Sequence, residues 1–99
     1  MLVDGWNLIL SAEREFSNSD SLLAHYRELA TDDCRVWIIF DGPKENTRVE
    51  GNLCVSYTGG EGEQRADKMI KAIVRASKYL GIRDLIEVHT HDKILLNAL

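Results

Sequence analysis

The chain has 99 residues, 44% of them hydrophobic, which is enough for one compact core, so we expect a single domain over residues 1–99. Its formal net charge of −4 argues against a surface that grips polyanions everywhere, so any nucleic-acid binding must come from a local patch. No stretch approaches the roughly 18 apolar residues of a membrane span, and the first residues lack the basic start of a signal peptide. The two cysteines are unclustered, which suits small buried residues and not a disulfide framework. We therefore expect a cytoplasmic protein with no membrane partner.

An apolar run at the start of the chain breaks at Asp4-Gly5, and a second run, Trp37 to Phe40, breaks in the same way at Asp41-Gly42. Continuously apolar runs suit strands that are covered on both faces, as in a parallel sheet, and each glycine lets the chain turn sharply. Two parallel strands would carry Asp4 and Asp41 to the same edge of the sheet, where open α/β sheets bind ligands. The alternative is a two-residue hairpin at each Asp-Gly pair, although neither pair is flanked by the alternation that hairpins favour.

A helix is predicted between these two strands, because a parallel pair requires a crossover connection. Ser17, Asn18 and Ser19 are candidate N-caps for this helix. The second strand then covers Arg35 to Phe40. Apolar residues recur at helical spacing between the caps and that strand: Leu22, Leu23, Tyr26, Leu29 and Ala30.

The middle of the chain predicts a loop, a strand and a second loop. The first loop covers Pro43 to Asn52, and the third strand covers Leu53 to Thr58, which is rich in β-forming residues. The glycine-rich stretch Gly59 to Glu63 lacks the lysine and hydroxyl of a P-loop, and its two glutamates would repel an anion. We therefore interpret it as a loop at the sheet edge and not as a phosphate site.

A longer helix is predicted from Arg65, and Gly81 is in position to end it. Asp67 falls beside its apolar stripe at about 100° per residue. A fourth strand is predicted over Leu85 to Thr90, closed by His91-Asp92, and another helical run begins at Lys93. The apolar stripe of the longer helix comprises Ala66, Met69, Ile70, Ile73, Ser77 and Leu80.

An acid therefore follows every predicted strand. Asp4, Asp41 and Asp92 end the first, second and fourth strands, and the third leads through a short loop to Asp67. Carboxylates at close range raise one another's pKa unless a cation lies among them. Mg²⁺ and Mn²⁺ prefer such oxygen ligands, and an open site of this kind can bridge a phosphodiester and activate water to attack it.

These motifs, in order and over nearly the whole chain, resemble the signature of NYN domains, the YacP-like branch of the PIN-like nuclease superfamily. The resemblance implies a three-layer α/β/α sandwich, with a parallel sheet in the order 3-2-1-4, and a metal-dependent ribonuclease activity. It also implies that the four aspartates bind the metal and act in catalysis, with Asn7 and Thr90 supporting the site. Lys68 and His91 depart from the family pattern, and the chain stops at Leu99, where relatives continue into a further strand and helix. The motifs are Val3-Asp4-Gly5-Trp6-Asn7, Ile38-Ile39-Phe40-Asp41-Gly42, Ala66-Asp67 followed by Ile70, and Thr90-His91-Asp92.

The longer helix carries five basic residues against a single acid, Asp67. Lys71 and Lys78 fall on the same side of the helix as Asp67. A basic stripe beside an acidic metal site is what a polyanionic substrate requires, so we expect RNA, in single-stranded form, to contact Arg65, Lys71 and Lys78. The alternative is a solvated helix face. The basic residues are Arg65, Lys68, Lys71, Arg75 and Lys78.

Other functions remain open from the sequence. The acids could be turn formers, or a helix-dipole partner in the case of Asp67. The two histidines His89 and His91 face the same way on a strand, as zinc ligands do, although no further ligand converges with them. A catalytically silent NYN-like domain that binds RNA or protein is the main alternative to a ribonuclease. A phospho-acceptor domain would also gather acids at strand ends, but the adjacent acid pair after the first strand is missing.

In the order 3-2-1-4, the strand Leu85 to Thr90 lies at an edge of the sheet. Edge strands usually carry Pro, Lys or a bulge that prevents pairing with another chain, and this one offers only Glu87 and the histidines. We therefore expect a homodimer formed through this strand. The competing expectation is that the final helix, from Lys93, folds back over the edge.

Overall fold

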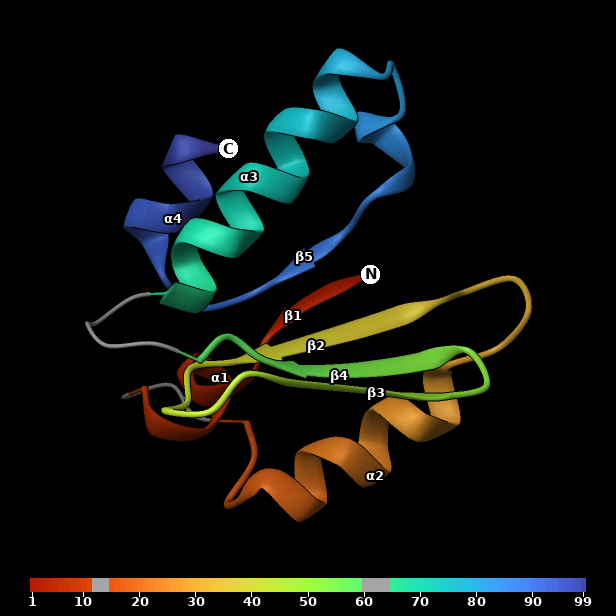
Figure 1. Ribbon diagram of the computed structural model, residues 1–99, viewed down its shortest axis with the longest axis vertical. Helices are drawn as coiled ribbons and strands as arrows, with labels where there is room; N and C mark the ends of the chain where they lie inside the picture. Colours follow the sequence, from red (N-terminus) through yellow and green to blue (C-terminus); the bar gives the residue numbers. More distant parts are fainter. Residues whose placement is uncertain (12–14, 60–64) are drawn as a thin grey trace.

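A five-stranded sheet runs through the molecule, with helices on both of its faces (Figure 1). The computed structural model describes residues 1–11, 15–59 and 65–99. The glycine-rich loop predicted at Gly59 to Glu63 falls outside them except for Gly59. The elements are β1 (Leu2–Asp4), α1 (Gly5–Leu10), α2 (Ser19–Leu29), β2 (Val36–Phe40), β3 (Asn46–Glu50), β4 (Leu53–Tyr57), α3 (Arg65–Tyr79), the 3₁₀ turn η1 (Arg83–Leu85), β5 (Val88–His89) and α4 (Lys93–Ala98).

The strands lie in the order β3-β4-β2-β1-β5. β1 pairs in parallel with β2 and β5, and β2 pairs in parallel with β4, so the four predicted strands have the predicted order. Neither Asp-Gly pair forms a hairpin, because α1 follows Asp4 directly and β2 pairs with β1 and β4 but not with β3. The sheet is thus mostly parallel, as the apolar runs predicted.

The loop prediction for Pro43 to Asn52 is wrong over half of its length. β3 lies within it and pairs antiparallel with β4, to which it is joined by a turn at Gly51, where φ is 59°. All five residues of β3 are exposed. An edge strand without a buried face has no apolar alternation, and this is why the sequence pattern did not reveal it.

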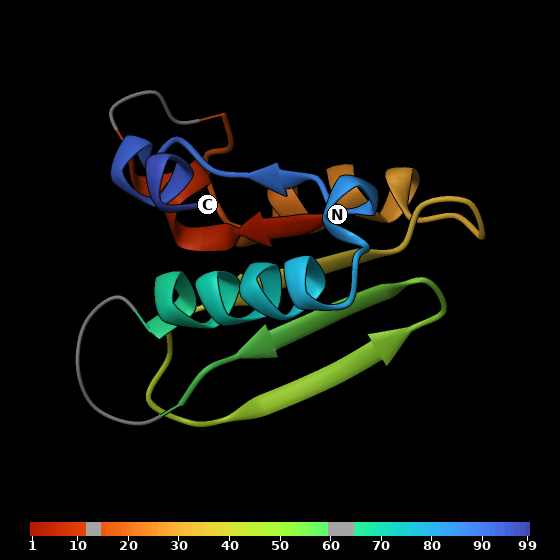
Figure 2. The same cartoon turned by 90° about the horizontal axis from the view of Figure 1, so that it is seen from above.

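The two faces of the sheet carry separate apolar clusters, because successive strand residues point to opposite sides. On one face, Val3 and Ile38 pack with α1 and α2, whose N-cap Asn18 forms a capping box with Ser21. On the other face, Leu2 and Ile39 pack with α3 and α4. Figure 2 shows α3 running along the middle of the sheet, with β3 at the edge of the sheet beyond it. The molecule therefore has three layers, with the sheet between the helix pair α1 and α2 and the helix pair α3 and α4.

The fourth predicted strand is much shorter than Leu85 to Thr90. Leu85 ends η1 and is 80% exposed, and only Val88 and His89 form β5. The strand is an edge, paired with Leu2 and Val3 of β1. α4 packs on the face of the sheet that α3 covers, where Leu95 is fully buried. A homodimer through this edge stays a prediction, with two strand residues available in each copy.

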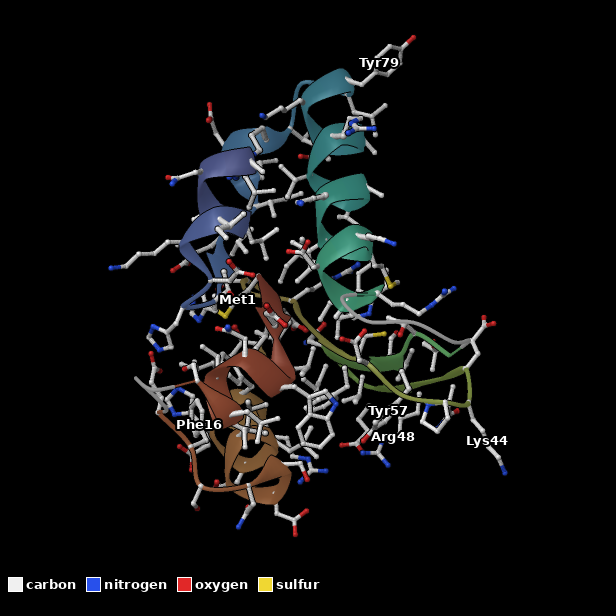
Figure 3. All side chains as sticks on the ribbon, turned by 90° about the vertical axis from the view of Figure 1, so that its left-hand side faces the viewer. Met1, Phe16, Lys44, Arg48, Tyr57 and Tyr79 are labelled. Atoms are coloured by element: carbon white, nitrogen blue, oxygen red, sulfur yellow. The ribbon has the colours of Figure 1, made fainter. Side chains whose placement is uncertain are left out.

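The helix predicted from Arg65 is α3, and its end at Gly81 is confirmed. Gly81 has φ of 74°. Its N–H donates to the Lys78 carbonyl at 3.1 Å, and the Ile82 N–H donates to the Ser77 carbonyl at 2.9 Å, which is the Schellman pattern. Beyond the last buried turn, Tyr79 projects away from the molecule (Figure 3). None of the described helices is long and apolar enough to cross a membrane.

Gly5 has a different role from the sharp turn that the sequence suggested. Its φ is not positive, and it is the first residue of α1. A Cβ built on Gly5 would overlap the ring of Phe40, which is fully buried and packs between Trp6 and Tyr57. Glycine is required there because α1 approaches β2 too closely for any side chain.

Gly5→Ala should therefore lower the free energy of unfolding by about 1–3 kcal/mol, since the new methyl group overpacks the core. Urea denaturation measures this loss. Phe40→Leu, combined with Gly5→Ala, should cost less than the sum of the two single changes, because it removes the ring that the methyl group meets. An unchanged urea midpoint in Gly5→Ala would show that the ring moves aside freely.

Candidate functional site

The four predicted acids lie at the carboxyl ends of the parallel strands and at the helix starts that follow them. Asp4 is the last residue of β1, Asp41 directly follows β2, Asp92 is the N-cap of α4, and Asp67 lies in the first turn of α3. Strand alternation places Asp4 on the same face as Leu2, which is the face that α3 covers. Asp4 is 8% exposed, and the other three are partly buried.

The negative charges of the other three acids lie close enough to Asp4 to repel its carboxylate. The pKa of Asp4 rises to about 6, first because the carboxyl group is buried and then because Asp67, Asp41 and Asp92 repel its negative charge. The hydrogen bond from Thr90 opposes this rise in the pKa. The four acids therefore form one electrostatic group, as the topology predicted.

Each of the four carboxylates uses one oxygen to hold the local structure. Among the described residues, the second oxygen of each makes no hydrogen bond or ion pair, and the Oδ1 atom of Asp67 is buried as well. Within the described part of the chain, four carboxylate oxygens are thus left for a ligand. Asp4 Oδ2 accepts a hydrogen bond from Thr90 Oγ1 at 3.0 Å, and Asp41 Oδ1 accepts one from the Ala66 N–H at 2.6 Å. Asp67 Oδ2 forms an ion pair with Lys71 Nζ at 3.1 Å, and Asp92 Oδ1 accepts from the Leu95 N–H at 3.1 Å.

Asn7 and Thr90 join the start of the chain to its end at this site. The Thr90 hydroxyl lies 3.0 Å from both Asp4 Oδ2 and Asn7 Oδ1, and it accepts from the Asp92 N–H at 3.1 Å. Asn7 Oδ1 also accepts from the His91 N–H at 2.5 Å. Both residues predicted to support the site therefore touch it, and together they fix the loop between β5 and α4 against α1.

The donor atoms suit a hard divalent cation, although their present arrangement does not enclose one. Carboxylate oxygens are the ligands that Mg²⁺ and Mn²⁺ prefer. The Oδ1 atom of Asp67 is buried without a hydrogen bond, and a bound ion would supply the partner that it lacks. In the described part of the chain, however, no group of three His, Cys, Asp or Glu side chains is placed so that it could hold a metal ion. The acids fit the metal by their chemistry and burial, but in this arrangement the described side chains do not converge on one ion.

The basic residues of α3 border the acids from one side. Lys71 pairs with Asp67, and Lys78 Nζ donates to the Leu99 carbonyl at the end of α4. Lys71 and Lys78 also line a hollow of about 300 Å³ together with Arg75. The predicted substrate contacts Lys71 and Lys78 thus lie along one groove between α3 and α4.

A second hollow, of about 270 Å³, is lined by Arg65, Lys68, Thr58 and Met69. Thr58 directly follows β4, and its hydroxyl lies 3.5 Å from Asp41 Oδ1, so this hollow adjoins the acidic site. Thr58 is not among the site residues predicted from the sequence, although its hydroxyl, at the end of the third predicted strand, occupies the position at which the other strands have an acid.

The zinc interpretation of the two histidines has no support among the described residues. His89 lies between the Tyr26 hydroxyl, 2.8 Å from Nδ1, and Glu87, 2.9 Å from Nε2. His91 pairs with Glu15 at 2.7 Å. Burial raises the pKa of Tyr26 to about 12, so its hydroxyl stays protonated.

A hollow larger than either of the two beside the basic residues lies away from the acids. It measures about 540 Å³ and is lined by residues at the amino ends of the strands, among them Leu2, Trp37 and Cys54, with Ile73 and Ile86 opposite. None of the four aspartates lines it. Size therefore does not identify the candidate site, which is defined by charge.

Removing one acid should stabilise the metal-free protein. The pKa of Asp4 is about 6 in the folded chain and 3.8 in a model compound, so the folded state holds its proton more tightly and stability falls as pH rises from 4 through 6. Asp4→Asn should abolish this fall and, at pH 7.5, raise the free energy of unfolding by on the order of 1–3 kcal/mol. Urea denaturation at several pH values measures both effects.

The matched control is Asp33→Asn, which removes an exposed acid and should keep the profile of the unaltered chain. A less stable Asp4→Asn protein with the original pH dependence would mean that the four acids do not repel one another.

Comparisons of this chain with protein-family models, with curated proteins and with solved structures found no significant match.

Proposed function

We propose that this protein is a metal-dependent ribonuclease that hydrolyses phosphodiester bonds of RNA. The observation that carries the proposal is the electrostatic group of four aspartates, in which Asp67, Asp41 and Asp92 act on the buried Asp4. Burying an acid among like charges is unfavourable, and a folded domain has little reason to keep the group unless it binds a cation.

The topology supports the resemblance to NYN domains. Without β3, the strands run β4-β2-β1-β5, the order that the PIN-like fold implies, and helices cover both faces. The motif residues Asn7 and Thr90 contact Asp4 or each other in the way that a supporting role requires. We propose a PIN-like sandwich in which β3 is an additional edge strand.

In this proposal, Asp4, Asp41, Asp67 and Asp92 hold Mg²⁺ or Mn²⁺. When bound, the cation supplies Lewis-acid chemistry that activates water for attack on phosphorus and stabilises the departing oxyanion. Thr90 orients Asp4 by donating to it, and the Ala66 N–H orients Asp41. These contacts hold the Asp4 and Asp41 carboxylates in defined orientations before substrate binds, so cation binding has fewer side chains to reorient.

The RNA backbone would lie along α3. Arg65 and Lys71 lie within two turns of this helix beside the acids, and Lys78 extends the positive charge toward its end. In a chain of net charge −4, such a local patch is what a nucleic acid requires. A single strand is the substrate form that we propose.

A second function is favoured by one observation. Because no three acidic side chains are placed to hold a metal within the described residues, the chain could be a catalytically silent NYN-like domain that binds RNA or protein. The two proposals differ in whether a divalent cation changes the protein.

For a nuclease, Mn²⁺ should raise the melting temperature, since a ligand that binds only the folded state stabilises it. Mn²⁺ should also start the cleavage of a labelled single-stranded RNA. Asp41→Asn should lose both responses, while Asp33→Asn should keep them. RNA binding without a metal-dependent shift or cleavage would identify the silent domain instead.

RNA binding should depend on the α3 patch. Lys71→Ala combined with Lys78→Ala should weaken RNA binding and reduce the slope of affinity against salt by about two, because each lost phosphate contact releases about one fewer counterion. Fluorescence anisotropy at several salt concentrations measures this. Arg27→Ala is the control, since Arg27 lies on α2, on the opposite face of the sheet. An unchanged slope in the double variant would mean that the patch is only a solvated face.

A further inference from the structure

The Lys71 ammonium is bound to the acidic group itself. Its Nζ lies 3.1 Å from Asp67 Oδ2, one helical turn away on α3. Among the described residues, this is the one ion pair that any of the four aspartates makes. The pair is partly buried, with side-chain exposures of 36% for Lys71 and 15% for Asp67.

An i,i+4 pair on a helix surface usually contributes little, because water and salt screen it. This pair differs in its surroundings. Asp67 is one of three acids whose charge acts on the buried Asp4, and its Oδ1 is buried without a hydrogen bond. Lys71 therefore neutralises a carboxylate that repels the buried Asp4, and Asp67 itself is largely shielded from solvent.

We propose that Lys71 is an internal counter-ion that competes with the divalent cation for Asp67, and that binding of the cation releases its ammonium for a phosphate of the substrate. This inference rests on the proposed function. Both cations need oxygens of the same carboxylate, and two cations on one carboxylate repel each other. The flexible lysine stem can leave Asp67 without any movement of the helix backbone.

The exchange couples the two ligands of the site. Before the cation binds, Lys71 is occupied by Asp67 and is a poor phosphate contact. Afterwards its charge is free, on the groove that Arg75 and Lys78 also line. By reciprocity, bound RNA that holds Lys71 should in turn strengthen metal binding. Lys71 is a positioning and substrate-binding group in this scheme and takes no part in bond breaking.

The test measures Mn²⁺ affinity without RNA, by electron paramagnetic resonance of the free ion. Lys71→Met keeps the apolar stem and removes the charge, so it should bind Mn²⁺ about tenfold more tightly than the unaltered protein. Lys71→Arg should restore the weaker binding. The matched control is Arg75→Met, which removes the same charge one turn further along α3 and should change the affinity less than twofold.

A second measurement uses a non-cleavable 2′-deoxy strand in place of RNA. Mg²⁺ should increase the affinity of the unaltered protein for this strand, and Lys71→Met should lose most of that increase. Equal Mn²⁺ affinities for Lys71→Met and the unaltered protein would overturn the inference about Lys71. In that case the proposed function would still stand if Asp41→Asn loses Mn²⁺ binding. If neither protein binds Mn²⁺, the inference and the proposed function fall together.

Discussion

The three residues of β1 hold the molecule together, because this strand pairs in parallel with β2 on one side and β5 on the other. All three residues are buried, and the side chains of Leu2 and Val3 lie in opposite apolar clusters. The strand is so short that its last residue, Asp4, is also the N-cap of α1. Burial of Asp4 is thus a consequence of the topology.

The cost of that burial is shared among several groups. Thr90 donates a hydrogen bond to Asp4, the Ala66 N–H and Leu95 N–H stabilise Asp41 and Asp92, and Lys71 neutralises Asp67. Two of these partners are backbone groups at the first turns of α3 and α4, where N–H groups lack helical acceptors. Asp41 and Asp92 therefore also cap the helices beside the candidate site. Each of the four carboxylates has one oxygen bound within the fold, and its second oxygen makes no hydrogen bond or ion pair among the described residues.

The sequence predicted the parts of this arrangement that depend on buried periodic patterns. The parallel strands, their order, the helix α3 with its end at Gly81, and the placement of the acids at strand ends all follow from apolar runs and the residues that interrupt them. Features without such a pattern were missed. β3 is exposed along its whole length, α1 begins inside an apolar run that reads as a strand, and β5 is cut to two residues because Leu85 turns out into a 3₁₀ helix. The need for glycine at position 5 depends on a contact with Phe40, 35 residues away, which no local pattern contains.

Two of the contacts that position the site join residues far apart in the sequence. Thr90 reaches Asp4 and Asn7 across sequence separations of 86 and 83 residues, and both bonds depend on β5 lying beside β1. The site therefore forms only when the two ends of the chain have come together, which is the slowest kind of contact to make during folding. Because β5 contributes just two residues to the sheet, much of what holds the loop after it must come from Asn7 and Thr90 themselves. The same hydrogen bonds that orient the acids also hold the last strand in place. Ligand binding at the acids should therefore affect the conformation of this edge of the sheet first.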